Sequence, residues 1–305
     1  MLTNLLTVAG QVLVLFLMMG VGFALAKFQK LSAAGLSQMS AVLLYVVAPC
    51  VIINAFQGDN LPSPSLLGVG LVALSVYYLV FMPASALFFG RQPPLTRSVL
   101  RFGMCYSNVG FMGLPLIEAT LGPEALIYGV ISMALFNIAQ WVHGTGVMGS
   151  KVSLKQAVLN PGVVGLLLGL PLLLLRVKLP LPLGTAVSLL ANLNTPLAMV
   201  VIGGQMAGAN LAATFTQPRL YTAVAGKLLV LPAIIMVLLL PFRLDPLLYC
   251  TCVILAATPS AGVTSIFAQR FGQDTAAAAQ LVTLSTLLSI LTMPVFAVLA
   301  QGLCR

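Results

Sequence analysis

The chain consists of long apolar segments that follow one another with only short polar loops between them. We count ten such segments, each close to the roughly 20 residues that a helix needs to cross a bilayer. No stretch between them is long enough to form a separate soluble domain. The segments run over residues 4–26, 36–56, 65–90, 97–121, 124–148, 157–175, 184–208, 217–240, 246–270 and 274–300.

The scarcity of charge excludes a water-soluble fold. Only 6% of the 305 residues are charged and 60% are hydrophobic, whereas soluble domains carry about 25% charged residues. Five acidic and fourteen basic side chains could not cover the surface of a soluble protein of this size. We therefore expect an all-α polytopic membrane protein, and we exclude a soluble enzyme and a nucleic-acid binder.

The Lys and Arg residues indicate which loops stay in the cytoplasm. With the N-terminus outside, the inner loops hold nine of them and the outer loops and C-terminus hold four; in the first half the split is seven to none. The first apolar run has no basic segment before it, so we expect a membrane helix and not a cleaved signal peptide. Both termini are expected outside, with the loop at 150–156 inside.

Sequence markers recur at a nearly constant spacing along the chain. This ordered series predicts two five-helix repeats, over 1–149 and 150–305. Because five is odd, the second repeat must enter the membrane from the opposite side, which is the inverted-repeat architecture of many secondary transporters. The marker pairs are Lys27 and Arg176, Pro49 and Pro196, Pro83 and Pro232, and Gly122 and Gly272, with offsets of 149, 147, 149 and 150.

Two of the expected membrane helices contain residues that interrupt helices. The helix at 97–121 carries Gly113 and Pro115 beside polar residues, and the helix at 246–270 carries Pro259 in the corresponding place. Gly and Pro weaken a helix, and Pro removes a backbone donor. We expect both helices to be broken at mid-membrane depth and to line a cavity there. The alternative is a pair of Pro kinks that only shape packing.

Such a break exposes groups that bind ions. The N-terminus of a half-helix presents free N–H groups and a positive dipole end, which can hold a carboxylate without a cationic side chain. Unwound carbonyls can hold a cation on the other side. We expect Asn108 to be the central substrate contact, because its amide can donate to a carboxylate. The other positions in the breaks expected to contact substrate are Ser107, Gly110, Thr258, Ser260, Gly262 and Thr264.

Three titratable side chains inside the expected helices are candidates for coupling or gating. Glu118 is either such a group or a solvated helix end, and His143 either relays protons or is a hydrogen-bonded helix residue. Lys227 either attracts an anion in a wet crevice or holds a cluster of carbonyls. One histidine and the pair Cys250 and Cys252 supply too few ligands for haem or zinc, so we expect no metal and no cofactor.

Small residues also suggest where helices pack closely. Gly165 and Gly169 form one GxxxG pair, and Gly204 and Gly208 form another. Pairs of this kind let two helix backbones approach each other. We expect them to serve internal packing, with dimerisation as the alternative.

The broken segments resemble the auxin efflux carrier family. The sequence at 107–116, SNVGFMGLPL, is similar to that family's first crossover motif, and this is the more specific part of the resemblance. The stretch at 258–262, with Phe267 and Pro294 after it, is similar to the second crossover and the last helix. Residues 137–141 resemble the family's glutamine-and-aromatic stretch, which marks Gln140 as a substrate contact.

The resemblance implies a fold shared with bile-acid symporters and sodium–proton antiporters. Helices 1, 2, 6 and 7 would form a scaffold that dimerises through the region of helices 2 and 7, and helices 3–5 and 8–10 would form a moving transport domain. The plant members export auxin and carry a long loop between helices 5 and 6. Here that loop is only about 150–156, similar to bacterial members described as permeases for malate or malonate.

The sequence thus predicts a secondary transporter of the bacterial inner membrane that moves a small organic anion by elevator-type alternating access. Its partners would be the anion, the lipid bilayer and a second copy of the chain, with no nucleic acid. An anion channel and a symporter coupled to sodium or protons remain alternatives. Membrane enzymes are disfavoured, because the chain has neither a Ser–His pair nor two buried Asp residues that could form an intramembrane active site.

The charge distribution generates a test of topology. A cysteine introduced at Ser150, after removal of the native cysteines, should react with an impermeant thiol reagent only from the cytoplasmic face. Labelling from the external face alone would overturn the predicted orientation.

Overall fold

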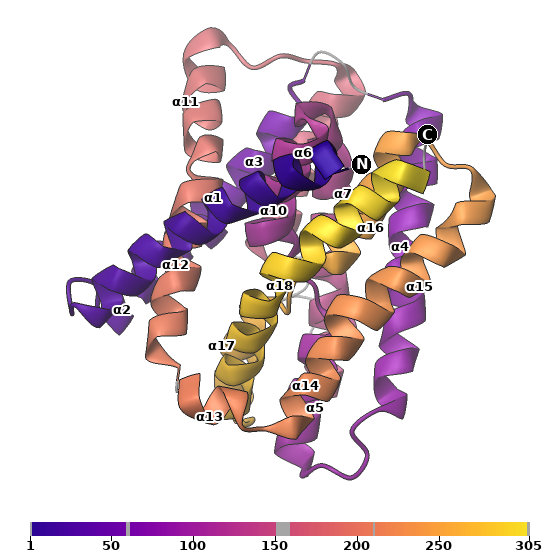
Figure 1. The fold of residues 1–305 in the computed structure, drawn as a ribbon. Helices are drawn as coiled ribbons and strands as arrows, with labels where there is room; N and C mark the ends of the chain where they lie inside the picture. The colour runs from indigo at the N-terminus through magenta and orange to yellow at the C-terminus, as the bar shows by residue number, and fades with distance from the viewer. Residues whose placement is uncertain (1, 59–61, 151–158, 210, 304–305) are drawn as a thin grey trace.

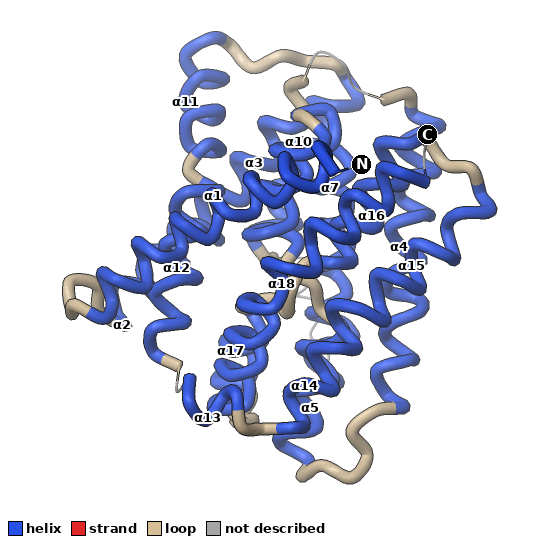
Figure 2. Tube along the Cα trace, viewed as in Figure 1, coloured by secondary structure: helices blue, strands red, loops and turns tan. Residues whose placement is uncertain are grey.

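The computed structural model describes residues 2–58, 62–150, 159–209 and 211–303, and all regular secondary structure in these ranges is helical (Figures 1 and 2). Asp59 and all but the first residue of the predicted inner loop at 150–156 lie outside the described residues. The start of α1 and the end of α18 lie close together in the upper part of Figure 1; α4 runs from the upper to the lower part, and α1 crosses obliquely to the left-hand edge.

The described residues of the first half form eight α-helices, with π-helical and 3₁₀ turns between some of them. The α-helices are α1 (Leu2–Lys27), α2 (Ala33–Val42), α3 (Ala48–Ala55), α4 (Pro64–Leu87), α5 (Pro94–Cys105), α6 (Leu114–Leu121), α7 (Leu126–Ala139) and α8 (Thr145–Val147). The turns between them are the π-helical η1 (Leu43–Val47), η2 (Val109–Gly113) and η4 (Gln140–Gly144), and the 3₁₀ turn η3 (Pro123–Ala125).

The second half likewise consists of α-helices with π-helical and 3₁₀ turns between some of them. Its α-helices are α10 (Pro161–Leu175), α11 (Leu181–Asn192), α12 (Asn194–Gly208), α13 (Leu211–Phe215), α14 (Pro218–Ala225), α15 (Leu231–Leu239), α16 (Pro246–Ala257), α17 (Val263–Arg270) and α18 (Thr275–Leu303). The π-helical η5 (Gly226–Val230) joins α14 to α15, and the 3₁₀ turn η6 (Leu240–Phe242) follows α15.

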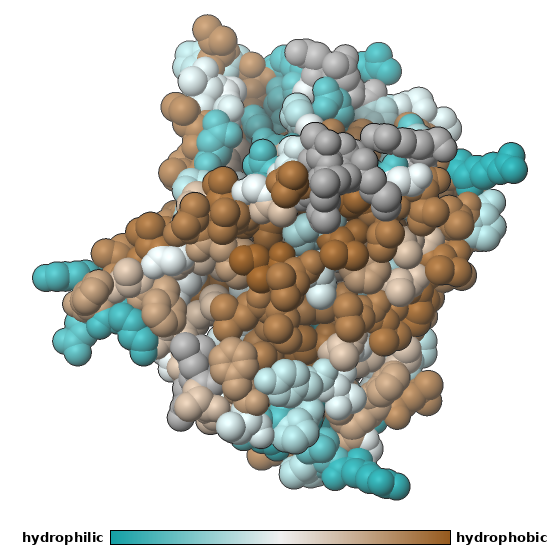
Figure 3. Space-filling model, viewed as in Figure 1, coloured by the Kyte–Doolittle hydropathy of each residue, from teal (hydrophilic) through white to brown (hydrophobic). Residues whose placement is uncertain are grey.

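The helices have the length and the surface of a multi-pass membrane protein. Seven continuous helical stretches in the described residues are long and apolar enough to cross a bilayer, and three shorter apolar helices accompany them. Figure 3 shows hydrophobic side chains covering the middle of one face, with hydrophilic side chains gathered mainly toward its upper and lower ends. Exposed apolar residues of this kind face lipid in a membrane protein.

Glycines set the closest helix contacts. A Cβ at Gly22 of α1 would collide with the backbone oxygen of Val200 in α12, so these two helices cross in direct backbone contact. In α10, a Cβ at Gly165 would lie 2.7 Å from Pro49 Cα, and one at Gly169 would lie 2.6 Å from the Phe56 ring. The first predicted GxxxG pair therefore serves internal packing between α10 and α3.

Several proline positions coincide with π-helical turns. Pro49, Pro115 and Pro232 each lie at the start of the α-helix that follows a π turn, namely η1, η2 and η5. Proline lacks the N–H that an α-helix would use and crowds the preceding turn, and a π turn accommodates this locally. Pro83, in contrast, lies inside α4, which continues through it.

The crossing of α1 and α12 generates a matched pair of variants. Gly22→Ala should destabilise the protein by about 1–3 kcal/mol, because the new methyl group meets backbone that cannot move aside. Gly20→Ala is the control in the same helix, since a Cβ there meets nothing within 4 Å. Thermal unfolding in detergent should show a lower Tm for Gly22→Ala alone. Equal Tm values for the two variants would contradict this account of the crossing.

Candidate functional site

Two helices are interrupted in the interior of the molecule. The chain leaves the helical conformation between Cys105, where α5 ends, and Val109, where η2 begins. It does so again between Ala257, where α16 ends, and Val263, where α17 begins. We refer to residues 106–108 as the first interruption and to residues 258–262 as the second.

The two interruptions pair with each other as short extended segments. Ser107 and Ser260 form an isolated antiparallel bridge. Asn108 N donates to Pro259 O at 2.8 Å, and Ala261 N donates to Tyr106 O at 2.9 Å. Backbone groups that lose their helical partners must find others inside a bilayer. Each interruption thus supplies partners for the other, and the four ends of the interrupted helices meet in one place.

Asn108 caps the second half of the first interrupted helix. Its Oδ1 accepts from the Phe111 N–H at 3.3 Å, and its backbone oxygen accepts from the N–H of Gly113 at 2.9 Å. The side chain is 5% exposed. Its Nδ2 has no hydrogen-bond partner in the described part of the chain, so this donor is available to a ligand at the positive end of η2 and α6.

Lys227 reaches the same place from η5. Its side chain is fully buried, at 0% exposure. The Nζ donates to Ser107 Oγ at 2.7 Å and to Ala256 O, in the last turn of α16, at 2.8 Å. Its two contacts are thus one hydroxyl oxygen and one carbonyl oxygen, both at ends of the interrupted helices. No carboxylate in the described ranges lies within the 4.0 Å of an ion pair with it.

Tyr77 of α4 makes the corresponding contact at the other helix end. Its hydroxyl donates to Cys105 O, at the end of α5, at 2.7 Å and lies 2.9 Å from Ser107 Oγ. Tyr77 and Lys227 are 227 − 77 = 150 positions apart, which lies within the 147–150 range of the marker offsets. Tyr77 of α4 therefore hydrogen-bonds the carbonyl end of α5, and Lys227 of η5 hydrogen-bonds the carbonyl end of α16.

A small pocket lies beside these contacts. It is lined by hydroxyl-bearing side chains of α4 and α7 and by the end of α16, including Tyr77, Tyr78, Ser107, Ser132 and Ala256. Two of these residues, Ser107 and Ala256, are the hydrogen-bond partners of Lys227. The space next to the ammonium is thus bounded by oxygen atoms and apolar side chains.

His143 is connected to the first interruption through Tyr106. The Tyr106 hydroxyl donates to Ala139 O at 2.9 Å and lies 3.0 Å from His143 Nδ1. The tyrosine is fully buried and the histidine is partly exposed. In the same stretch, Gln140 Nε2 donates to Asn137 Oδ1 at 3.0 Å, whereas the buried Gln140 Oε1 has no partner in the structure.

The hydroxyls of the second interruption have different surroundings. Thr258 Oγ1 donates to Leu255 O at 2.8 Å, which closes the end of α16. Ser260 N donates to Ser285 Oγ of α18 at 3.2 Å, and the buried oxygens Ser260 Oγ and Thr264 Oγ1 have no hydrogen-bond partner in the structure. Both residues are fully buried, so each hydroxyl is a polar group without a protein partner among the described residues.

Helix α12 faces both interruptions. Asn194 Nδ2 donates to Gly110 O at 3.2 Å, just after the first interruption. Gln205 Oε1 lies 3.6 Å from where a Cβ would stand on Gly262, in the second. A Cβ at Gly113 would lie 2.6 Å from Leu255 of α16, so this glycine permits close packing at the site.

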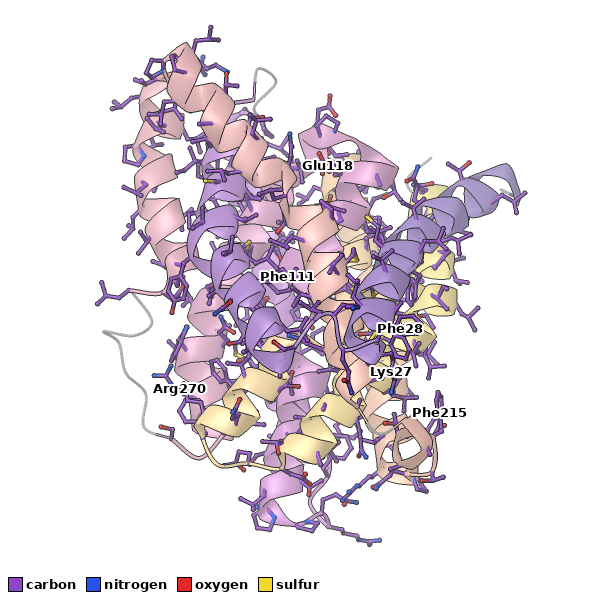
Figure 4. The ribbon with its side chains drawn as sticks, turned by 90° about the vertical axis from the view of Figure 1, so that its left-hand side faces the viewer. Lys27, Phe28, Phe111, Glu118, Phe215 and Arg270 are labelled. Carbon is purple, nitrogen blue, oxygen red and sulfur yellow. The ribbon has the colours of Figure 1, made fainter. Side chains whose placement is uncertain are left out.

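Glu118 is not part of this arrangement. It lies at the exposed end of α6, and Figure 4 shows it well above Phe111, whereas Lys27 and Arg270 lie in the lower half. The site thus unites Ser107, Asn108, Ser260 and Lys227 directly, and it reaches His143 through Tyr106. Tyr77, Tyr106 and Asn194 were not expected from the sequence. The repeat offset from Lys227 would have identified Tyr77.

Comparison with known proteins gives consistent results. A family model described as membrane transport protein matches residues 7–151 and again residues 145–297. A Rhizobium meliloti (strain 1021) protein named "Putative malonate transporter" is 24% identical over 304 aligned positions, covering 94% of this chain and 93% of that protein. The two family matches fall on the two halves of the chain.

The contacts of Tyr77 generate a stability test. Tyr77→Phe removes the hydroxyl shared by Cys105 O and Ser107 Oγ, and each lost hydrogen bond should cost about 0.5–1.5 kcal/mol. Tyr45→Phe is the control, because Tyr45 is 66% exposed on η1. A Tm lowered only in Tyr77→Phe is the expected result. No change in either variant would show that the hydroxyl does not hold the first interruption.

Proposed function

The chain belongs to the membrane transport protein family, as its resemblance to the auxin efflux carriers predicted, and we propose that it carries a small organic anion across the membrane. It is a transporter and not an enzyme. The observation that carries the proposal is the antiparallel pairing of the two interruptions, which gathers Asn108, two half-helix N-termini and one buried cation in one place.

We propose ten membrane spans arranged as two inverted five-helix repeats. On this proposal α5 with η2 and α6 forms the fourth span, and α16 with α17 forms the ninth. The matched positions of Tyr77 and Lys227 support the repeat, because each bonds to the carbonyl end of the interrupted helix in its own half. The start of α1 and the end of α18 lie close together in Figure 1, which supports termini on one side of the membrane.

The electrostatics of the interruption favour an anion. Half-helix N-termini carry positive partial charge, and the unpaired Asn108 Nδ2 can donate to a carboxylate. The Lys227 amine donates to Ser107, and no acidic residue of the described ranges forms an ion pair with it. In a low-dielectric interior, the half-helix N-termini, the Asn108 donor and the Lys227 amine all attract a negatively charged ligand.

We propose a short dicarboxylate such as malonate as the substrate class. The related Rhizobium meliloti protein bears that substrate in its name. The unpaired side-chain groups in the two interruptions include the donor Nδ2 of Asn108 and the buried Ser260 Oγ. A molecule with two carboxylates could bridge two such polar groups, whereas a large apolar anion would find few polar partners there.

We further propose elevator-type movement, with α1, α2, α3, α10, α11 and α12 as the scaffold. The packing of α1 on α12 and of α10 on α3 through glycines supports a rigid unit of this composition. The hydrogen bond from Asn194 to Gly110 O would then join the scaffold to the moving domain in this conformation and break during movement.

Placement in the bacterial inner membrane and pairing of two copies belong to the same proposal. Exposed apolar residues occur on η1 and α11, among them Tyr45 and Leu189. These elements belong to the second and seventh helices, the region through which the resemblance implies a homodimer.

Asn108 provides the direct test of the substrate site. Asn108→Asp keeps an oxygen that can cap Phe111 N, but it replaces the amide donor with a negative charge. Fold stability should therefore change little, while malonate affinity should fall roughly 10- to 100-fold or more, because a charge-assisted hydrogen bond is lost and a like charge is added. Binding by isothermal calorimetry, with Tm measured in parallel, checks both parts.

A second substitution separates the binding role from the capping role. Asn108→Ser retains a capping acceptor and adds no charge, so it should fold and still bind malonate about tenfold or more weakly than wild type. Well-folded Asn108→Ser and Asn108→Asp with wild-type affinity would remove Asn108 from the site.

A further inference from the structure

The Lys227 ammonium is held by oxygen atoms, as a bound metal cation would be. Its ammonium contacts two oxygens, a serine hydroxyl from the first interruption and the Ala256 carbonyl next to the second. Hydroxyl and carbonyl oxygens are the ligands that hard cations take from proteins. The Tyr77 ring, 5.8 Å from Nζ, supplies a further weakly attractive face.

The carbonyl ends of two helices lie at the interruptions. Helices α5 and α16 both end at the interruptions, and the carbonyl end of each helix carries negative partial charge. Tyr77 satisfies the end of α5 with a neutral hydroxyl, so Lys227 is the charged group that neutralises this pair of ends. Burial of a cation in a membrane is costly unless such partners surround it.

We propose that Lys227 is a resident cation that occupies the place of a coupling Na⁺, so that the protein moves its organic anion without requiring sodium. This inference rests on the proposed transport function. A second cation beside Ser107 would meet the ammonium at short range, where like charges repel strongly in a low dielectric. Removal of the ammonium would leave Ser107 Oγ and Ala256 O as ligands for a small external cation.

The first measurement uses wild-type protein in proteoliposomes. Initial uptake of labelled malonate is compared in sodium, potassium and N-methylglucamine media at a clamped membrane potential. The three rates should agree within about twofold, because the required positive charge is covalently attached. Uptake that stops without Na⁺ would overturn the proposal, and this result needs no variant.

The second measurement uses Lys227→Ala, which opens space next to the small pocket. In N-methylglucamine medium its uptake should fall roughly tenfold or more, and Na⁺ or methylammonium should restore it. Tyr77→Phe is the control: it loses a hydrogen bond at the same serine but keeps the charge, so its uptake should not depend on the cation. A folded Lys227→Ala that transports without any small cation, or that no cation restores, contradicts the proposal.

A readout independent of transport separates this inference from the proposed function. In detergent, methylammonium or Na⁺ should raise the Tm of Lys227→Ala by a few degrees through binding to the folded state, and it should leave the wild-type Tm unchanged. If wild-type protein shows no malonate uptake at all, the proposed function fails and this measurement still decides the role of Lys227. Equal shifts in both proteins would reject a resident cation.

Discussion

The rest of the site depends on two short backbone segments that satisfy each other inside the molecule. In hydrocarbon, an interrupted helix leaves N–H and C=O groups that no water can bind. The bonds from Asn108 N to Pro259 O and from Ala261 N to Tyr106 O meet this requirement reciprocally. Because each interruption needs the other, the four half-helix ends are fixed together, and their partial charges are concentrated in one small volume.

The polar groups at this point have the polarity that the proposed anion transport would require. Asn108 caps a positive half-helix end and keeps a donor open, while Lys227 neutralises a negative end instead of pairing with a carboxylate. Tyr77 makes the equivalent contact with the carbonyl end of α5 through an uncharged hydroxyl. Tyr77 and Lys227 therefore make equivalent contacts, and the lysine makes the two contacts chemically different.

The all-helical composition and the two helix interruptions could be predicted from the sequence, because they follow from local residue chemistry. Apolar length indicated the helices, and the glycines and prolines near Asn108 and Thr258 indicated the interruptions. The partner of Lys227 could not be predicted, since burial alone does not distinguish an anion from a carbonyl. Tyr106 and Asn194 were missed because each acts through one hydrogen bond that only the packed helices create. The π turns before three prolines likewise depend on how the following helix packs.

The central claim is that the paired interruptions hold the transported anion. A cryo-electron microscopy map of the protein with saturating malonate tests this most directly. Our account predicts ligand density in contact with the Asn108 side chain, between the starts of η2 and α17. Density confined to another part of the protein, with the interruptions unchanged and empty, would contradict it.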